Sequence, residues 1–250
     1  MSSKSAFMLS VISIIVAIWA LWKAYTPEIS ITEKGAIGGN LTVMVEEAII
    51  KKPEMIVNAI TELTKKKEKK EMEVQKEEVA KHKEALFGDK DNPIAGNAEG
   101  DIKVVEFFDY RCGYCRRGYG PLHEAVKKDG KVQVIYKELP IFGGEPLLAR
   151  AALAAHKQGR YDDFHRALMN SDGGADEEAL ETMANKLGLD VARWKTDMND
   201  PEIIAMIERN KDLAAQLGIS GTPTFIIGED LYPGFLTVDQ FHEAFKRARD

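Results

Sequence analysis

The sequence contains very little cysteine, only two residues among 250. This number excludes a small secreted scaffold held together by several disulfide bonds. It also leaves too few thiolates for a four-ligand zinc site, and the five histidines lack the paired spacing of zinc ligands. No basic patch is present and the net charge is −6, which argues against nucleic acid as a partner. We therefore expect neither a metal site nor nucleic-acid binding.

The two cysteines lie close together, in the motif Cys112-Gly113-Tyr114-Cys115. They follow an apolar run, residues 104–108, that is typical of a buried strand, and a helix-like stretch comes after them. A strand that delivers C-x-x-C to a helix start is typical of a thiol–disulfide redox site. Unpaired N–H groups at a helix start favour the thiolate of Cys112, the nucleophile in disulfide exchange. A zinc half-site and a static disulfide are the alternatives, and both fit the rest of the chain less well.

One carboxylate, Glu106, lies inside the apolar strand before the cysteines. A buried carboxylate is costly and tends to have a raised pKa. Beneath a C-x-x-C site, such a group can take or give the proton of Cys115 during exchange. The alternative is an edge-strand glutamate that faces water. Lys137, at the end of the next expected strand, is a candidate ion-pair partner for Glu106.

We divide the chain into five parts from its composition and turn signals. Residues 1–25 are a transmembrane anchor or signal sequence, 26–40 a flexible tether, 41–87 a helical stalk, 88–100 a linker, and 101–250 a redox domain.

The N-terminal segment is apolar from Ala6 to Trp22 apart from two serines. A transmembrane helix needs roughly 17 to 25 apolar residues, so this length just suffices. Bulky residues occupy the positions where signal peptidase requires small ones, which favours an uncleaved anchor over a signal peptide. Both interpretations place the rest of the chain outside the cytoplasm, where disulfide chemistry is tolerated.

The expected stalk has two kinds of sequence. Apolar residues recur at helical spacing between Leu41 and Leu63, whereas the following stretch is mostly lysine and glutamate. In that stretch Met72, Val79 and Leu86 recur every seven residues. The segment is either a solvated single helix held by charge pairs or an oligomerisation stalk.

The redox domain is expected to alternate strands and helices. The predicted strands are Lys103–Phe108, Val132–Tyr136 and Thr224–Ile227, with a short run near Leu231 as a further hairpin strand. Several short helices are expected between residues 146 and 217, as an insertion before the third strand.

This order of elements resembles the DsbA family of thioredoxin-fold enzymes. The resemblance rests on Val105-Glu106-Phe107-Phe108-Asp109-Tyr110-Arg111-Cys112-Gly113-Tyr114-Cys115, Tyr136-Lys137-Glu138-Leu139-Pro140 and Gly221-Thr222-Pro223-Thr224-Phe225. The helices before the redox domain are similar to the N-terminal extension of the ScsC-like branch, some of whose members are trimers. The resemblance implies an α/β thioredoxin fold with a helical insertion and no cofactor beyond a redox-active Cys112–Cys115 disulfide.

The resemblance also implies roles for individual residues. Cys112 would be the exposed nucleophile and Cys115 the buried resolving cysteine. The candidate substrate-binding residues are Thr222, Pro223, Gly113 and Tyr114. Thr222 and Pro223 would form a loop facing the cysteines, joined by a cis peptide bond. One departure is the dipeptide Gly113-Tyr114, which is that of the isomerase DsbC and differs from the Pro-His of the oxidase DsbA.

These features predict an extracytoplasmic thiol–disulfide oxidoreductase that forms or rearranges disulfide bonds in secreted or envelope proteins. The dipeptide and the stalk favour an isomerase, while a DsbA-like oxidase, a reductase and a non-catalytic surface protein are alternatives. The expected partners are unfolded or misoxidised proteins, a membrane redox partner that recycles the site, and further copies of the chain in a dimer or trimer. We expect the protein in the periplasm, anchored in the inner membrane by its N-terminal segment.

Overall fold

The computed structural model describes residues 45–47, 49–143 and 145–250. The anchor and tether expected at 1–25 and 26–40 lie outside the described residues. Within the described part of the chain, no helix combines the length and the apolar character needed to cross a membrane. The described residues fall into two units, one that ends at Glu62 and one that spans Leu63–Asp250.

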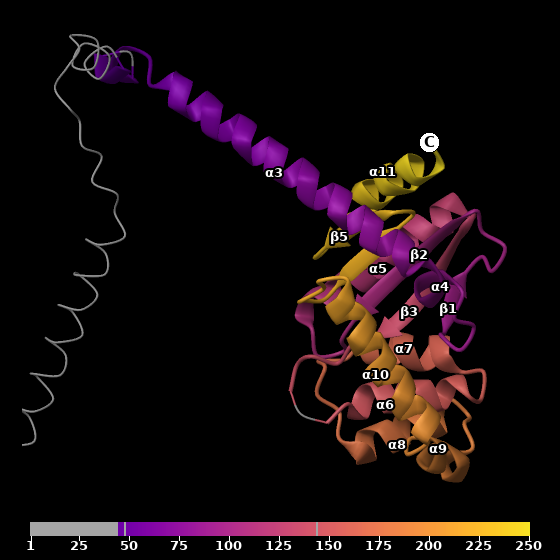
Figure 1. The fold of residues 1–250 in the computed structure, drawn as a ribbon. Helices are drawn as coiled ribbons and strands as arrows, with labels where there is room; N and C mark the ends of the chain where they lie inside the picture. The colour runs from indigo at the N-terminus through magenta and orange to yellow at the C-terminus, as the bar shows by residue number, and fades with distance from the viewer. Residues whose placement is uncertain (1–44, 48, 144) are drawn as a thin grey trace, which may run out of the picture. The chain divides into compact units, whose positions relative to one another are not determined.

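A five-stranded sheet forms the centre of the second unit (Figure 1), in the order β1-β3-β2-β4-β5. The strands β2 and β3 are parallel, while β1, β4 and β5 run antiparallel to their neighbours. Their bounds are β1 Ile94–Gly96, β2 Ile102–Phe108, β3 Val132–Glu138, β4 Thr224–Ile227 and β5 Asp230–Pro233. The central strand β2 therefore ends between β3 and β4, directly before the cysteine motif.

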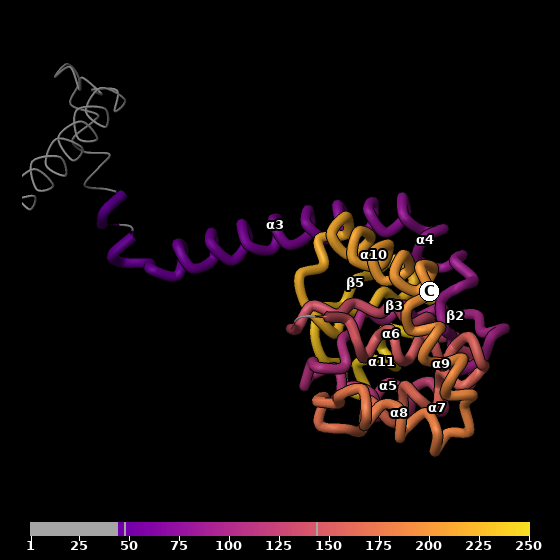
Figure 2. Tube along the Cα trace, turned by 90° about the horizontal axis from the view of Figure 1, so that it is seen from below, coloured from indigo at the N-terminus to yellow at the C-terminus, as the bar shows by residue number. Residues whose placement is uncertain are grey.

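Helices cover both faces of the sheet. On one face α5 (Gly113–Asp129) packs beside α11 (Val238–Arg249), and their apolar residues join one large core. On the other face α10 (Pro201–Gln216) and α4 (Lys83–Phe87) contribute to a second, smaller core. Figure 2 shows α5 and α10 on opposite sides of the strands. The result is a three-layer arrangement that buries β2 and β3 on both faces.

A group of four short helices lies between β3 and α10 in the sequence. They are α6 Leu147–His156, α7 Tyr161–Met169, α8 Glu177–Lys186 and α9 Val191–Asp197. Asp176 and Asp190 cap α8 and α9 by accepting hydrogen bonds from backbone N–H groups in the first turn. These caps and the intervening turns explain why the insertion forms several helices instead of one.

Alternation along β2 determines where Glu106 lies. Successive side chains of a strand point to opposite faces. Val104 and Phe108 belong to the core on the α5 side, whereas Val105 and Phe107 belong to the core on the α10 side. Glu106 therefore lies on the α5 side, which is also the side of Cys115.

The strands agree closely with the sequence prediction, with one exception. The three predicted longer strands are present, and two of them are slightly longer than expected. The exception is β1, which lies within the segment 88–100 that we expected to be a linker. Its three residues pair antiparallel with β3, from Ile94 opposite Ile135 to Gly96 opposite Gln133. A strand of this length is too short to produce a detectable alternation.

The lysine- and glutamate-rich stretch belongs to one helix, α3 (Glu54–Lys81), which has 28 residues. Val79 near its end and Leu86 of α4 are buried in the core on the α10 side, with Phe107 and Ile135. Met72 remains exposed. Two of the three residues in the seven-residue recurrence therefore belong to the intramolecular core, although they lie on two separate helices.

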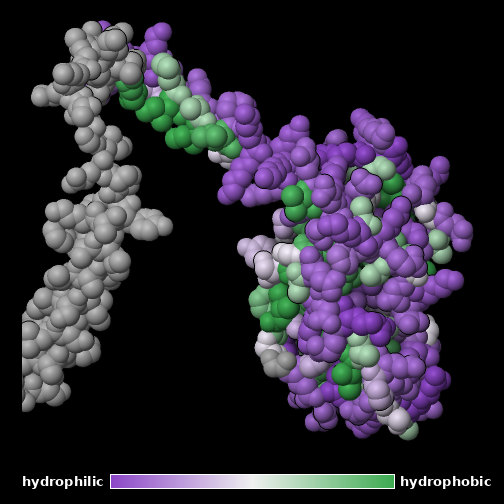
Figure 3. Space-filling model, in the orientation of Figure 1, coloured by the Kyte–Doolittle hydropathy of each residue, from purple (hydrophilic) through white to green (hydrophobic). Residues whose placement is uncertain are grey.

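The first turns of α3 have a different character. Met55, Ile56, Val57 and Ile60 are all large, apolar and exposed. Figure 3 shows the hydrophobic band that they form, followed by a hydrophilic stretch of the same helix. Exposed apolar residues grouped in this way commonly mark an interaction surface.

Candidate active site

The first cysteine lies at the start of α5. Cys112 is the N-cap residue, and its Sγ accepts a hydrogen bond from the backbone N–H of Cys115 over 3.4 Å. An N-cap position faces the unpaired N–H groups and the positive end of the helix dipole. Both cysteines are free thiols. The expected combination of a strand, a C-x-x-C motif and a helix start is therefore present.

The two thiols differ little in accessibility. Cys115 is fully buried, as expected, but Cys112 is only 4% exposed, which corrects the expectation of an exposed nucleophile. The reason is a contact with the facing loop, in which the Cys112 thiol donates a hydrogen bond to the carbonyl oxygen of Thr222 over 3.1 Å. The peptide bond between Thr222 and Pro223 is cis, as the family resemblance implied. The loop therefore meets the sulfur of Cys112 through Thr222.

Glu106 is almost completely buried, with 1% of its surface exposed. It is not on an edge strand, because Tyr136 of β3 and Phe225 of β4 are its neighbours on either side. Burial raises the pKa of the Glu106 carboxyl to about 8. Burial, and then the charge of Glu106, raise the pKa of the Cys115 thiol well above its ordinary range. The expected burial of Glu106 is therefore present, and its role in moving the proton of Cys115 stays a prediction.

Lys137 does not pair with Glu106, which corrects the sequence-based suggestion. The residue of β3 opposite Glu106 is Tyr136, so Lys137 points to the other face of the sheet. There its Nζ donates a hydrogen bond to the carbonyl oxygen of Ala85 over 2.9 Å and lies 3.7 Å from the carboxylate of Asp89. Burial lowers the pKa of Lys137 to about 8.

The dipeptide between the cysteines faces solvent. Gly113 is exposed, and a side chain added to it would contact nothing. Tyr114 is 60% exposed, and the guanidinium of Arg117 lies over its ring at 4.3 Å from the centroid. A cation over an aromatic face is a favourable contact that orders both side chains. The first turn of α5 thus presents an aromatic and a cationic group next to Cys112.

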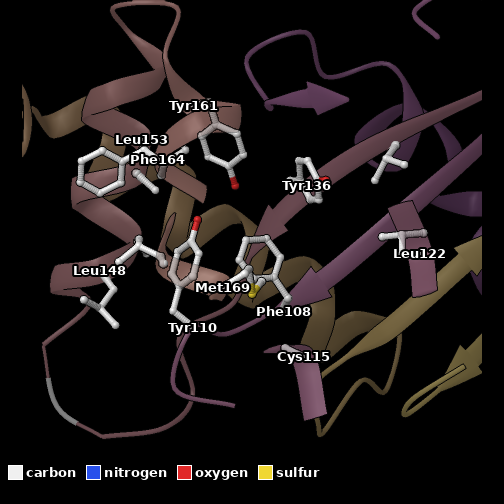
Figure 4. Packing of buried hydrophobic residues seen from close by; sticks show 14 of the residues in the cluster. Phe108, Tyr110, Cys115, Leu122, Tyr136, Leu148, Leu153, Tyr161, Phe164 and Met169 are labelled. Atoms are coloured by element: carbon white, nitrogen blue, oxygen red, sulfur yellow. The ribbon is translucent and has the colours of Figure 1, made fainter. Parts of the chain in front are cut away.

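Two features near the cysteines escaped the sequence analysis. The first is a buried polar cluster around Glu138, whose Oε1 accepts hydrogen bonds from Tyr110 over 3.0 Å and from Tyr161 over 2.8 Å. Figure 4 shows these tyrosines with their hydroxyl groups pointing toward one another beside Phe108. Nδ1 of His165 lies 2.9 Å from the Tyr110 hydroxyl oxygen. Tyr110 and Glu138 stand in two of the motifs quoted from the sequence, but their contact with each other, with Tyr161 and with His165 depends on the fold and was not visible there.

The second feature is Asp109, which is buried beside the cysteine motif. Its carboxylate accepts hydrogen bonds from three backbone N–H groups, those of Arg111, Ile141 and Phe142. The sequence places Asp109 after a strand but does not show that a second loop meets it there. Among the described residues, no group of three or more histidine, cysteine, aspartate and glutamate side chains is arranged to hold a metal ion.

Comparisons with known proteins agree with this geometry. The profile of the thioredoxin family matches residues 88–247, which confirms the expected thioredoxin-like α/β fold. A thioredoxin-like oxidoreductase from Silicibacter pomeroyi DSS-3 is 44% identical, with a TM-score of 0.64 over 66% of this chain and 96% of that one. The catalytic domain of Proteus mirabilis ScsC is 26% identical, with a TM-score of 0.63 over 69% of this chain and 97% of that one.

Two curated relatives each match 54% of the chain. It is 27% identical over 150 residues to the probable disulfide bond formation protein D of Bacillus anthracis, covering 54% of this chain and 69% of that protein. It is also 30% identical over 135 residues to the Na(+)/H(+) antiporter NhaA of Herminiimonas arsenicoxydans, where it spans only 22% of the antiporter's length and 54% of its own. The chain belongs to the thioredoxin family, and within that family it is similar to the DsbA- and ScsC-type thiol–disulfide oxidoreductases.

Proposed function

We propose that this protein catalyses thiol–disulfide exchange and thereby forms or rearranges disulfide bonds in secreted or envelope proteins. The observation that carries the proposal is the position of the Cys112 sulfur, which caps α5 next to buried Cys115, with buried Glu106 on the same side of the sheet as Cys115. Burial of a carboxylate costs free energy, and a purely structural role for the two cysteines would not require one nearby. Membership in the thioredoxin family supports the proposal.

In the proposed reaction, the Cys112 thiolate attacks one sulfur of a client disulfide. A bond forms between Cys112 and the client, the client S–S bond breaks, and a client thiolate leaves. In an isomerisation, another client thiolate then displaces Cys112, and no net oxidation occurs. In a reduction, Cys115 displaces the client, so that Cys112–Cys115 is oxidised and the client gains two electrons. Oxidation of a client dithiol is the reverse sequence.

Glu106 is proposed to move the proton of Cys115. Because burial raises the pKa of this thiol, it needs a nearby base when it attacks the mixed disulfide. The Glu106 carboxyl, with a pKa of about 8, exchanges a proton near neutral pH. Thr222 and Pro223 are proposed to hold the client backbone beside Cys112, and Gly113 and Tyr114 to contact the client from the helix side.

We propose isomerisation as the main direction. The Gly113-Tyr114 dipeptide, which the family resemblance links to the isomerase DsbC, supports it. The exposed apolar band of α3 also supports it, because self-association into a dimer or trimer would place several sites around one client. Oxidation is the second candidate, and it is supported by the similarity to the Bacillus anthracis protein named for disulfide bond formation.

The proposed compartment is the periplasm, with residues 1–25 as an inner-membrane anchor. The apolar sequence from Ala6 to Trp22 supports this placement. A membrane redox partner would return the cysteine pair to its working state, the dithiol for an isomerase and the disulfide for an oxidase.

The proposal is tested by reactivation of a scrambled-disulfide protein in glutathione buffer. If the protein is an isomerase, wild type reactivates the substrate. Ile60→Glu, in the apolar band of α3, should then abolish reactivation but leave the oxidation of a dithiol peptide unchanged. Val74→Glu should change neither activity. Ile60 and Val74 are both exposed on the same helix, which makes them a matched pair. Peptide oxidation without reactivation would identify an oxidase. If Cys112→Ser alters neither assay, the protein is a non-catalytic binding protein.

A further inference from the structure

The arginines of the chain fall into two groups. Those distant from the cysteine motif in sequence each have a carboxylate oxygen within 4.0 Å, and they are Arg150, Arg160, Arg166, Arg193, Arg209, Arg247 and Arg249. Among the described residues, no carboxylate oxygen lies within this distance of Arg111, Arg116 or Arg117. We call these three residues, which lie directly before Cys112 and in the early turns of α5, the arginine rim. Acidic residues outnumber basic ones in the whole chain, so the lack of ion pairs is a local property.

Backbone carbonyl groups hold the two exposed members of the rim. Nη1 of Arg111 donates hydrogen bonds to the carbonyl oxygen of Phe142, over 3.3 Å, and to that of Gly143. Nε of Arg117 donates a hydrogen bond to the carbonyl oxygen of Gly113 over 3.3 Å. A carbonyl oxygen carries no net charge, so these bonds order the side chains without neutralising them. A guanidinium has five N–H donors, and these bonds use only part of them.

The third member, Arg116, is enclosed by a turn of the helical insertion. Its Nη1 donates a hydrogen bond to the carbonyl oxygen of Tyr110 over 2.8 Å. The turn contains Gly173, whose φ is 84°, and its backbone comes so close to the guanidinium that a Cβ at this position would overlap Nη1. The rim thus contains one cation held between α5 and the insertion and two cations that reach solvent.

The carboxylates in the segments that the rim contacts have other partners. Asp109 accepts hydrogen bonds from three backbone N–H groups. Glu145 pairs with Arg150, and Asp172 accepts a hydrogen bond from the backbone N–H of Gly174 over 3.0 Å. Because Asp109 supplies one negative charge against the three cations of the rim, a positive excess remains beside the cysteine motif.

A fixed positive excess beside a reactive sulfur favours partners with negative charge. The planar guanidinium matches a carboxylate through two parallel hydrogen bonds. Side chains that are ordered before binding lose less entropy when a partner docks. Complementary charge also raises the rate of encounter, and salt weakens this effect. The positive end of the α5 dipole acts in the same direction. The rim is therefore arranged for carboxylates that approach Cys112.

We propose that the arginine rim selects clients with carboxylates next to the reacting cysteine, and that Arg111 and Arg117 bind these carboxylates. The inference rests on the proposed function and names its substrate class as acidic segments of secreted or envelope proteins. Arg111 adjoins Cys112, and Arg117 bonds to the residue that follows it, so an anion held by them shares the site with the client's cysteine. This placement favours a client over a second copy of the chain.

The test uses the full chain and two dithiol peptides that differ only in having glutamate or glutamine on both sides of one cysteine. Each kcat/KM is divided by the rate at which the same peptide reacts with a small neutral disulfide, which removes the effect of glutamate on the peptide thiol. Wild type is expected to favour the glutamate peptide about fivefold at low salt, because an exposed ion pair contributes a factor of this size. Both peptides meet the same enzyme, so any change in Cys112 itself cancels from the ratio.

Substitutions in the rim should change this preference according to their charge. Arg111→Gln combined with Arg117→Gln should abolish it, whereas Arg111→Lys combined with Arg117→Lys should keep most of it. Salt at about 1 M should abolish it in wild type, because charges then interact only over about 3 Å. Lys127→Gln removes a cation from the exposed far end of α5 and should leave the preference unchanged.

Several results would overturn the inference. One is a wild type that shows no preference at low salt, and another is a double glutamine variant that keeps the wild-type preference. An equal loss of preference in Lys127→Gln would show that the charge of the whole molecule, and not the rim, attracts the acidic peptide. Unchanged preference together with lost self-association in the double glutamine variant would assign the rim to a second copy of the chain. A wild type that exchanges neither peptide contradicts the proposed function itself.

Discussion

Burial of a single carboxylate gives the site its sensitivity to pH. Glu106 occupies the central strand of the sheet, and its side chain is buried on the α5 side with 1% of its surface exposed. Its ordinary pKa of 4.5 rises to about 8 as a result. Below pH 4.5 the group is protonated in the folded and unfolded chain alike. As the pH rises toward 8, only the unfolded chain releases the proton, so the folded state loses stability.

We therefore expect Glu106→Gln to change how stability depends on pH. The free energy of unfolding of wild type should fall by roughly 3 to 5 kcal/mol between pH 5 and pH 9 relative to the variant. Urea unfolding at both pH values measures the difference, and other titrating groups such as Lys137 cancel because both proteins contain them. A constant difference between the two proteins across this range would show that Glu106 does not titrate in the folded chain.

The same substitution should slow the chemical step of Cys115. Without a base beside a thiol of raised pKa, release of a mixed disulfide by Cys115 is expected to slow by about 100-fold. Stopped-flow measurement of this release, started from Cys112 joined to a peptide, reports the step directly. Glu124→Gln on the exposed face of α5 serves as the control. Equal release rates in Glu106→Gln and in the control would rule out a role for Glu106 in proton transfer.

At the scale of elements, the cluster around Glu138 joins the end of β3 to the helical insertion. Tyr110 follows β2 and Tyr161 begins α7, and both donate to the same carboxylate oxygen. Nδ2 of Asn210 in α10 also donates a hydrogen bond to the backbone carbonyl of Glu138 over 3.3 Å. Three elements thus meet at one residue next to the cysteine motif.

Removal of one of these contacts should weaken the fold measurably. Tyr161→Phe is expected to lower the free energy of unfolding by about 1 to 2 kcal/mol, because a buried acceptor loses a donor. Tyr114→Phe, at an exposed position, should change it by less than about 0.5 kcal/mol. Urea denaturation of both variants provides the comparison. Similar values for the two would indicate that Glu138 finds an equally good donor elsewhere.

The elements differ in how far the sequence predicts them. β2 and β4 are predictable because each is a mostly apolar run, interrupted in β2 by Lys103 and Glu106, and the helix start at Cys112 is predictable from the C-x-x-C spacing. The strand β1 is not, because three residues carry no period. The predicted pairing of Lys137 with Glu106 was wrong because the register between β2 and β3 decides on which face of the sheet Lys137 lies, and this register cannot be read from the sequence of a single strand. Asp109 was missed because its partners lie in a loop distant in sequence.

At the scale of the whole molecule, we propose that one of the two units carries out thiol–disulfide exchange and the other mediates self-association. The second unit holds the cysteine motif, and the first carries most of the exposed apolar residues of α3. Burial of such residues in a dimer or trimer would remove them from water, which is the main driving force for association.

Sedimentation velocity of the full chain tests this association. Wild type should sediment as a dimer or trimer, and Ile60→Glu should shift it to the monomer, because a charge in an apolar interface is costly to desolvate. Val74→Glu, on the hydrophilic part of the same helix, should behave like wild type. A monomeric wild type would contradict the role given to the apolar band.

The central claim is that Cys112 is the attacking sulfur and Cys115 the resolving one. Mass spectrometry of the full chain after incubation with a disulfide-containing peptide tests it most directly. The account predicts that Cys115→Ser accumulates a covalent adduct on Cys112, because the resolving thiol is gone. It also predicts that Cys112→Ser forms none, because burial and the charge of Glu106 raise the pKa of the Cys115 thiol and keep it protonated. An adduct of equal yield on Cys112→Ser, or no adduct on Cys115→Ser, would contradict the account.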